Sequence, residues 1–249
     1  MQLVSFKISE KRSEKKSEKS DEKSTEASSF GAVVEGRVVD LGRHFPEYDS
    51  LKCLLAGNGL VRALDTAAEE SPDYRLDKVK LRTPIPDTGT LLCVFDDARD
   101  EPVSVDPKFI RGSNRALQIP DGDSKPIAAG VVVAVKATET GFTVLGYMLI
   151  GYLSPATLAA GPWLTTADEL PSGAEFALEA SADEDKAKLA LPDPTELALT
   201  LAEERELQTG DLVAILHYLP ELTAEPETTL QITSEQLGTL TCPVEATGD

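Results

Sequence analysis

Residues 127–137 read IAAGVVVAVKA, and residues 142–152, which follow after a short polar turn, read FTVLGYMLIGY. Both segments are rich in β-branched and aromatic residues, which favour strands. Their apolar residues stand at consecutive rather than alternate positions, so a strand here has two apolar faces, and both must be covered. The two segments therefore predict central strands in a protein built mainly from β-sheet.

Further strands are predicted around this pair, because short apolar runs are bounded by Gly, Pro and Asp. They comprise residues 91–95, 175–182, 212–218, 228–232 and 239–244. One helix interrupts them over residues 195–206, where Asp193 and Pro194 form a typical helix start. Residues 83–249 are therefore predicted to form a β-rich domain with few helices.

Residues 1–82 are predicted to form a small α+β domain. Apolar strands are expected at residues 3–6 and 32–39, the second being a hairpin that turns through Glu35 and Gly36. Two helices follow at residues 51–55, with Ser50 as a candidate cap, and at Leu60–Glu69. Residues 83–90 are predicted to be a linker. The fold class expected for the whole chain is α+β, mostly β.

Residues 9–28 consist of five near-copies of one tetrad: SEKR, SEKK, SEKS, DEKS and TEAS. In a helix the glutamates of successive tetrads would stack at i,i+4 spacing, which is destabilising. The segment also has no apolar stripe with which to dock. It is therefore predicted to be a disordered, solvated insertion in the N-terminal domain.

The chain is strongly acidic: 24 Lys and Arg stand against 43 Asp and Glu, which gives a net charge of −19. This charge disfavours binding to nucleic acids and to anionic membranes. The sequence contains no apolar run of transmembrane length and no secretion signal at its start, so we expect a cytoplasmic protein. The three cysteines, Cys53, Cys93 and Cys242, are far apart and are expected to be buried, reduced thiols.

Catalytic motifs are scarce. The sequence contains no phosphate-binding glycine loop and no nucleophile-elbow pattern. Its two histidines are His44 and His217. Weak catalytic candidates are His217, near the end of an apolar strand, and Asp97 and Asp100, in an acidic cluster after residues 91–95. A purely structural interpretation is also open for each: His217 as a histidine with a local hydrogen bond, and Asp97 and Asp100 as residues of a solvated loop.

Short segments spread over nearly the whole chain resemble the fumarylacetoacetate hydrolase (FAH) superfamily in order and spacing. They are LVSF (3–6), GAVV (31–34), RVVDLG (37–42), YRLDKVKL (74–81), PIP (84–86), LLCV (91–94), GPWLTTADELP (161–171), LQTGDLV (207–213) and LGTL (237–240). The segment 161–171 is the most specific. The resemblance implies a mixed β-sandwich roll for the C-terminal domain, and metal-dependent hydrolysis, isomerisation or decarboxylation of oxo-acids for active members.

The resemblance also locates the functional positions, where this sequence departs from the family. The family's Glu-x-Glu metal ligands fall at about Ala128 and Gly130, and the third carboxylate falls near Tyr152. The Asn-Tyr-x-x-His loop is replaced by residues 95–100, and the lysine before Gly-Pro-Trp is absent. An active member would hold Mg²⁺ or Mn²⁺, but these residues supply no carboxylate. We therefore expect no metal and no catalytic residue at the family site.

Three functional hypotheses remain. The chain could be a non-catalytic scaffold or regulatory homologue of the family. It could be a hydrolase or isomerase of oxo-acids with a relocated site. It could also bind a small molecule in the vacated cleft, lined by Tyr147, Tyr152 and Tyr218. The family association and the two apolar faces of residues 127–137 further predict a dimer, with an identical chain or an active paralogue as the partner.

Overall fold

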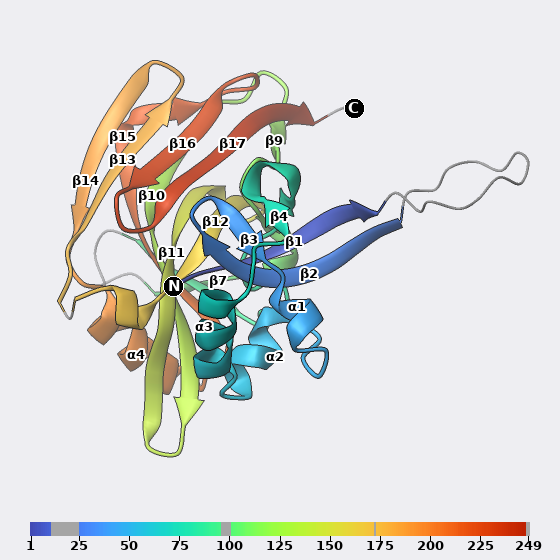
Figure 1. Ribbon diagram of the computed structural model, residues 1–249. Coiled ribbons are helices and arrows are strands. Elements are labelled where there is room, and N and C mark those ends of the chain that lie inside the picture. The colour runs from blue at the N-terminus through green and yellow to red at the C-terminus, as the bar shows by residue number, and fades with distance from the viewer. Residues whose placement is uncertain (11–24, 96–100, 172, 248–249) are drawn as a thin grey trace, which may run out of the picture.

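The computed structural model describes residues 1–10, 25–95, 101–171 and 173–247. Figure 1 shows two sheets, and the helices lie on opposite sides of the long central strands of the larger sheet. The α-helices of the described residues are α1 (Leu41–His44), α2 (Leu51–Ala56), α3 (Leu60–Glu69) and α4 (Thr195–Glu204). Short 3₁₀ turns lie at Leu76–Lys78, Pro107–Phe109 and Ala167–Glu169. This arrangement confirms the predicted α+β, mostly β class.

Two sheets contain the strands. The larger has the order β4-β3-β2-β1-β12-β11-β10-β15-β6-β7, with β5 and β8 joined at its side, and the smaller has the order β14-β13-β16-β17-β9. The strands are β1 (Gln2–Glu10), β2 (Thr25–Val34), β3 (Arg37–Val39), β4 (Tyr74–Arg75), β5 (Lys80–Leu81), β6 (Leu91–Phe95), β7 (Val103–Val105), β8 (Ile110–Arg111), β9 (Leu117–Pro120), β10 (Lys125–Thr138), β11 (Gly141–Ser154), β12 (Thr157–Thr166), β13 (Phe176–Ala182), β14 (Asp185–Leu191), β15 (Leu212–Ala224), β16 (Thr229–Ser234) and β17 (Gly238–Thr247).

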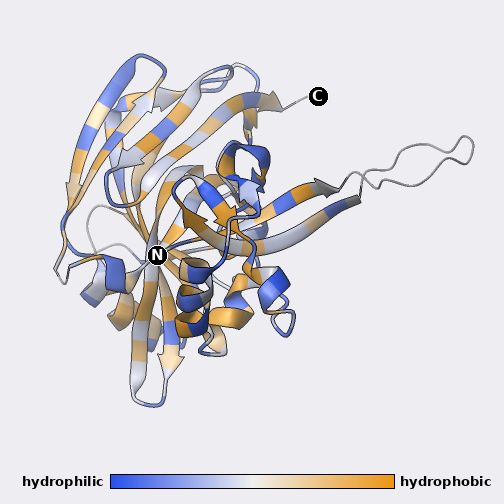
Figure 2. Ribbon diagram, in the orientation of Figure 1, coloured by the Kyte–Doolittle hydropathy of each residue, from blue (hydrophilic) through white to orange (hydrophobic). Residues whose placement is uncertain are grey.

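Strand β10 lies in the middle of the larger sheet and is covered on both faces. Its odd-numbered side chains, such as Val131, pack with the smaller sheet and α4, whereas its even-numbered side chains, such as Val132, pack with residues of the N-terminal helices. Figure 2 shows the contrast between the apolar central strands and the hydrophilic outer strand β14. The chain itself thus supplies both layers, and the argument that a second subunit must cover β10 was wrong. The dimer stays a prediction that rests on the family resemblance.

The N-terminal segment shares the larger sheet with the C-terminal half. Strand β1 pairs with β12, where Leu3 lies opposite Leu164. The predicted linker is also packed rather than free: Ile85 is fully buried, and the Ser5 hydroxyl donates a 2.6 Å hydrogen bond to the Pro84 carbonyl. The division at residue 82 remains a prediction, but the segment does not form a sheet of its own.

The structure confirms the predicted turn of the first hairpin and the predicted starts of two helices. Glu35 and Gly36 adopt positive φ angles of 49° and 73° at the turn between β2 and β3, which is the requirement of a tight hairpin. The Ser50 side chain accepts a hydrogen bond from the Cys53 amide at the start of α2. Asp193 accepts a 2.9 Å bond from the Thr195 amide at the start of α4.

One cysteine departs from expectation. Cys93 and Cys242 are buried, and burial raises the pKa of each thiol to about 12. Cys53 is exposed, because α2 turns Leu51, Leu54 and Leu55 inward and Cys53 lies on the opposite side of the helix. In the described residues, no helix has the length and apolar character that a membrane crossing requires.

The tetrad repeat is partly strand, contrary to the predicted insertion over residues 9–28. Strand β1 continues to Glu10 and β2 begins at Thr25, and these two residues are paired. Within the paired part, the Glu26 carboxylate accepts hydrogen bonds from Lys80 at 2.6 Å and Lys7 at 3.1 Å. These two ammonium groups lower the pKa of Glu26 to about 2. The prediction of disorder for residues 11–24 concerns residues outside those described.

Replacing residues 11–24 by a two-residue turn is expected to leave stability nearly unchanged. The closure entropy of a loop varies slowly with its length, so the free energy of unfolding should change by no more than about 1 kcal/mol. Urea denaturation measures this. A deletion of residues 9–28 is the matched comparison, since it also removes Glu26 and its two lysine contacts. A loss of several kcal/mol from the shorter deletion would contradict the prediction.

Candidate functional site

Three aromatic side chains gather where the resemblance places the family's metal site. Ala128 on β10 lies directly between Tyr152 on β11 and Tyr218 on β15, its two register partners. The ring of Phe95, at the end of β6, stacks on Tyr218 at 5.1 Å between centroids and meets Tyr152 edge-on at 5.0 Å. We call Phe95, Tyr152 and Tyr218 the aromatic site.

The side chains of the aromatic site differ in their exposure to solvent. Tyr152 is 6% exposed and Tyr218 is 43% exposed. Burial, followed by the neighbouring Cys93 and Tyr218, raises the pKa of Tyr152 to about 12. Its hydroxyl carries a proton at neutral pH, as a tyrosine of ordinary pKa does, and can act as a hydrogen-bond donor. An apolar wall with a protonated hydroxyl suits a ligand that carries a carbonyl or carboxylate oxygen.

Tyr147, the third predicted cleft residue, is not in the aromatic site. It lies on the opposite face of β11, where its hydroxyl is 2.6 Å from the Thr195 hydroxyl and its ring is 5.3 Å from that of Phe176. It lines a separate cavity of about 270 Å³ between α4 and the smaller sheet. Burial also raises the pKa of Tyr147. The alternation of side chains decides this, because Tyr147 and Tyr152 are an odd number of positions apart in a regularly paired part of one strand.

The weak catalytic candidates do not form a described cluster. His217 lies within β15, opposite Ala129, and not at the end of the strand, because β15 continues to Ala224. It is half-buried and faces away from Tyr218, its neighbour in the strand. Asp97 and Asp100 lie outside the described residues. In the sequence they follow Phe95, which ends β6.

The described residues do not fit a divalent cation at this position. Ala128, Gly130 and Tyr152 offer no carboxylate, whereas a magnesium site generally includes one or two. Among the residues described, no group of three or more His, Cys, Asp or Glu side chains could hold a metal ion. Gly130 also has no room for a ligand: a Cβ atom there would lie 1.9 Å from the Ile215 carbonyl oxygen.

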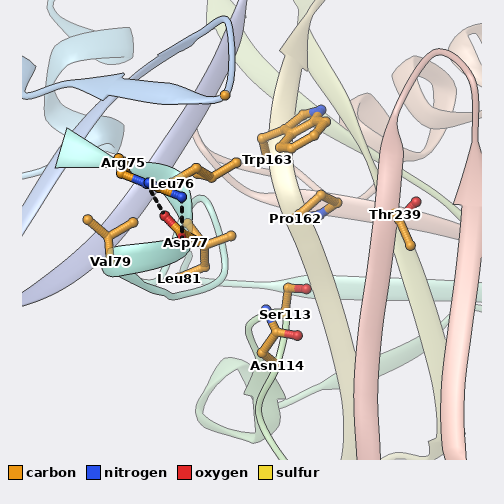
Figure 3. A pocket seen from close by; sticks show the side chains of 11 residues that line it. Arg75, Leu76, Asp77, Val79, Leu81, Ser113, Asn114, Pro162, Trp163 and Thr239 are labelled. Carbon is orange, nitrogen blue, oxygen red and sulfur yellow. Dashed lines mark hydrogen bonds and ion pairs between the residues drawn. The ribbon is translucent and has the colours of Figure 1, made fainter. Parts of the chain in front are cut away.

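A second cavity, of about 510 Å³, is lined by Pro162 and Trp163 of β12 and by residues of the segment 75–81 (Figure 3). Arg75 and Asp77 form one wall and are paired, with Nε–Oδ1 and Nη2–Oδ2 distances of 3.0 and 3.1 Å. Trp163 belongs to the Gly-Pro-Trp segment, whose Gly161–Pro162 peptide is cis. The remaining lining residues are Gly36, Leu76, Val79, Leu81, Ser113, Asn114 and Thr239.

Comparison with known proteins finds the fold but no close relative. No family model matches the sequence, and no curated protein matches it either. The structure is similar to maleylpyruvate hydrolase from Sphingobium sp. SYK-6, with a TM-score of 0.75 and 15% identity over 99% of this chain and 100% of that one. The complex of that enzyme with manganese(II) and pyruvate gives a TM-score of 0.73 and 16% identity, over all of both chains.

A further similar structure is 2-keto-3-deoxy-D-arabinonate dehydratase with magnesium and 2,5-dioxopentanoate, at a TM-score of 0.64 and 12% identity, over all of both chains. These neighbours show that this chain has the fold of maleylpyruvate hydrolase and of 2-keto-3-deoxy-D-arabinonate dehydratase. At such low identities the similarity establishes the fold alone.

Sequence reasoning found part of the candidate site. It named Tyr152 and Tyr218 but missed Phe95, although Phe95 ends a predicted strand. Parallel pairing of β6 with β15 sets Phe95 beside Leu216, and this pairing joins segments more than 100 residues apart. The cavity at Trp163 was missed as well, because its lining comes from five separate stretches of the chain.

Proposed function

We propose that this chain binds a small oxo-acid at the aromatic site without a divalent metal. The observation that carries the proposal is that Tyr152 and Tyr218 flank Ala128, the position that the FAH resemblance assigns to a metal ligand. The superfamily's fold is retained, while the chemistry of this position is aromatic and hydroxylic. The ligand class is drawn from the neighbouring structures, which contain pyruvate and 2,5-dioxopentanoate.

The two tyrosines supply the recognition. The Tyr152 hydroxyl, protonated at neutral pH, donates to a carbonyl or carboxylate oxygen of the ligand. Tyr218 forms the exposed edge and is stacked on Phe95, so both rings shield one face of a planar molecule. Such a site needs no cation, which agrees with the absence of carboxylates at Ala128 and Gly130.

Calorimetric titration with pyruvate and with 2,5-dioxopentanoate is expected to show saturable binding that is the same in EDTA and in Mn²⁺. Mn²⁺ alone should show no stoichiometric binding. Tyr218→Ala is expected to weaken oxo-acid binding about tenfold, since it removes a hydrogen-bonding group and an aromatic wall.

Tyr48→Phe is the control, because Tyr48 packs at the turn between α2 and α3 and its loss of a hydroxyl leaves the aromatic site intact. Micromolar one-to-one binding of Mn²⁺, or oxo-acid binding that requires it, would contradict the metal-free proposal. Equal affinities of Tyr218→Ala and the unaltered chain would remove the aromatic site from it.

A second candidate function is a hydrolase or isomerase of oxo-acids with a relocated site. Its support is that Asp97 and Asp100 follow Phe95 in the sequence, together with the enzymatic character of the structural neighbours. This function requires that the chain turn over an oxo-acid such as maleylpyruvate, which an absorbance assay measures. It also requires that Asp97→Asn or Asp100→Asn abolish this turnover. A chain with neither binding nor turnover would be the non-catalytic scaffold or regulatory homologue.

A further inference from the structure

The cavity at Trp163 combines polar groups from both halves of the chain around one aromatic ring (Figure 3). Arg75 ends β4, and Asp77 lies in the 3₁₀ turn that follows it. Ser113 and Asn114 come from the loop before β9, and Thr239 comes from β17. Its volume of about 510 Å³ falls within the range of small-molecule sites, about 300 to 1,000 Å³. The cavity is separate from the aromatic site, since Tyr152 and Tyr218 are not among its lining residues.

The charges of the two ionised lining residues, Arg75 and Asp77, cancel, while Lys78, outside the lining, lies 3.6 Å from the same carboxylate. The Arg75 guanidinium and the Asp77 carboxylate are bonded to one another through two contacts, and Arg75 lowers the pKa of Asp77. Both side chains are more than half exposed, at 70% and 52%, so each still presents hydrogen-bonding capacity to the cavity. The guanidinium adds N–H donors and the carboxylate adds lone pairs. The pair thus offers donors and acceptors side by side with no net charge.

The other polar residues extend this mixed set. Ser113 is only 3% exposed and its hydroxyl oxygen accepts a 3.3 Å bond from the Thr241 amide, which leaves the hydroxyl proton available to another acceptor. The amide side chain of Asn114 and the hydroxyl of Thr239 also line the cavity. Each of these groups can both donate and accept hydrogen bonds, as the hydroxyl group of an alcohol can.

Trp163 provides the aromatic surface. Its ring is held tightly at one edge, because a Cβ atom on Gly238 would lie 2.2 Å from its Cζ2 atom. Its indole Nε1 is buried and has no hydrogen-bond partner among the described residues. Because Nε1 is buried and lies on the side of the ring away from Arg75 and Ser113 in Figure 3, Trp163 offers the cavity its ring surface and not this donor.

We propose that this cavity binds a small neutral polyhydroxylated molecule, of the size of a monosaccharide. Hydroxyl groups can satisfy the donors and acceptors of the Arg75–Asp77 pair, Ser113 and Asn114 at the same time. The apolar C–H face of such a molecule suits the indole of Trp163. A small anion fits less well, because Asp77 neutralises Arg75 and the chain carries a net charge of −19.

Trp163 is the only tryptophan of the chain, so its fluorescence reports directly on this cavity. Titration of the full chain with D-glucose, D-ribose and myo-inositol, each up to about 100 mM, is expected to give a saturable fluorescence change with at least one of them. Acetate and inorganic phosphate should give none. Absence of a saturable change with all three polyols would overturn the proposal, as would a change with the anions alone.

Substitutions test whether the fluorescence change comes from binding in this cavity. Arg75→Ala and Asn114→Ala are each expected to weaken polyol binding about tenfold, because each removes hydrogen bonds to the ligand. Arg62→Ala, an exposed arginine on α3, should leave the affinity unchanged. Unaltered affinity in both cavity variants, with unaltered folding by circular dichroism, would place the binding elsewhere and reject this site. Tyr218→Ala should not affect the polyol signal, so failure of oxo-acid binding and failure of polyol binding are distinguishable.

Discussion

Asp211→Ala is expected to lower the free energy of unfolding by about 3 to 5 kcal/mol, because it removes three hydrogen bonds to one buried carboxylate. Asp211 is 3% exposed. Its Oδ1 accepts from the amides of Gly89 and Thr90 at 3.0 and 3.1 Å, and its Oδ2 accepts from the amide of Gln208 at 2.8 Å. The alanine variant leaves these three amides without their carboxylate partner.

The effect should spread beyond the residue itself, because these bonds connect the segment before β6 to the start of β15. Chemical denaturation in urea measures it. Asp211→Asn should cost less, since the amide oxygen can still accept two of the three bonds. Asp106→Ala is the matched surface control: Asp106 accepts one bond from the Lys108 amide, so its loss should cost no more than about 1 kcal/mol. If the Asp211 and Asp106 variants lose equal stability, Asp211 does not have this role.

Gly130→Ala is expected to destabilise the chain by about 3 kcal/mol, although it adds only a methyl group to a strand. The new Cβ atom would lie 1.9 Å from the Ile215 oxygen, 2.8 Å from the Ile215 carbonyl carbon and 3.0 Å from the Leu216 Cα atom. All three atoms belong to backbone in the neighbouring strand β15. Strands β10 and β15 would therefore have to separate in the middle of the sheet.

The reverse exchange in the same strand is the control. Ala137 lies at the exposed end of β10, and Ala137→Gly should cost only about 0.5 to 1 kcal/mol. Thermal and urea unfolding compare the two variants. A fully stable Gly130→Ala protein would show that β15 can move aside, and would make a ligand side chain at position 130 acceptable. With the expected loss, introducing Glu at positions 128 and 130 would unfold the sheet and would not create a metal site.

Local sequence patterns were sufficient for several elements of this fold, although strands β12 and β14 were not among those predicted. The hairpin at Glu35 and Gly36, the cap at Ser50 and helix Leu60–Glu69 each depend on neighbours within a few residues. The strand Leu91–Phe95 was predicted with its exact bounds, and the consecutive apolar residues of β10 indicated correctly that both faces are covered. These signals are local because turns, caps and periodicity act over a single element.

The tertiary structure alone decided what covers β10 and which residues meet at the site. The sequence shows that both faces of a strand are apolar, but the smaller sheet and the N-terminal helices that cover them come from distant parts of the chain. Tyr147, Tyr152 and Tyr218 were predicted as one group, yet strand alternation turns Tyr147 to the other face, and Phe95 contacts Tyr152 and Tyr218 instead.

The sequence by itself determined the class of fold, the acidic charge and the absence of carboxylates at residues 128 and 130. Only the tertiary structure decided that Gly130 excludes a side chain, that Asp211 holds three amides, and that Trp163 faces an arginine–aspartate pair across a cavity. The physical reason is that burial and close approach depend on strand register between segments far apart in the chain. Residue identity sets the available chemistry, and the packing of distant segments sets which groups can reach one another.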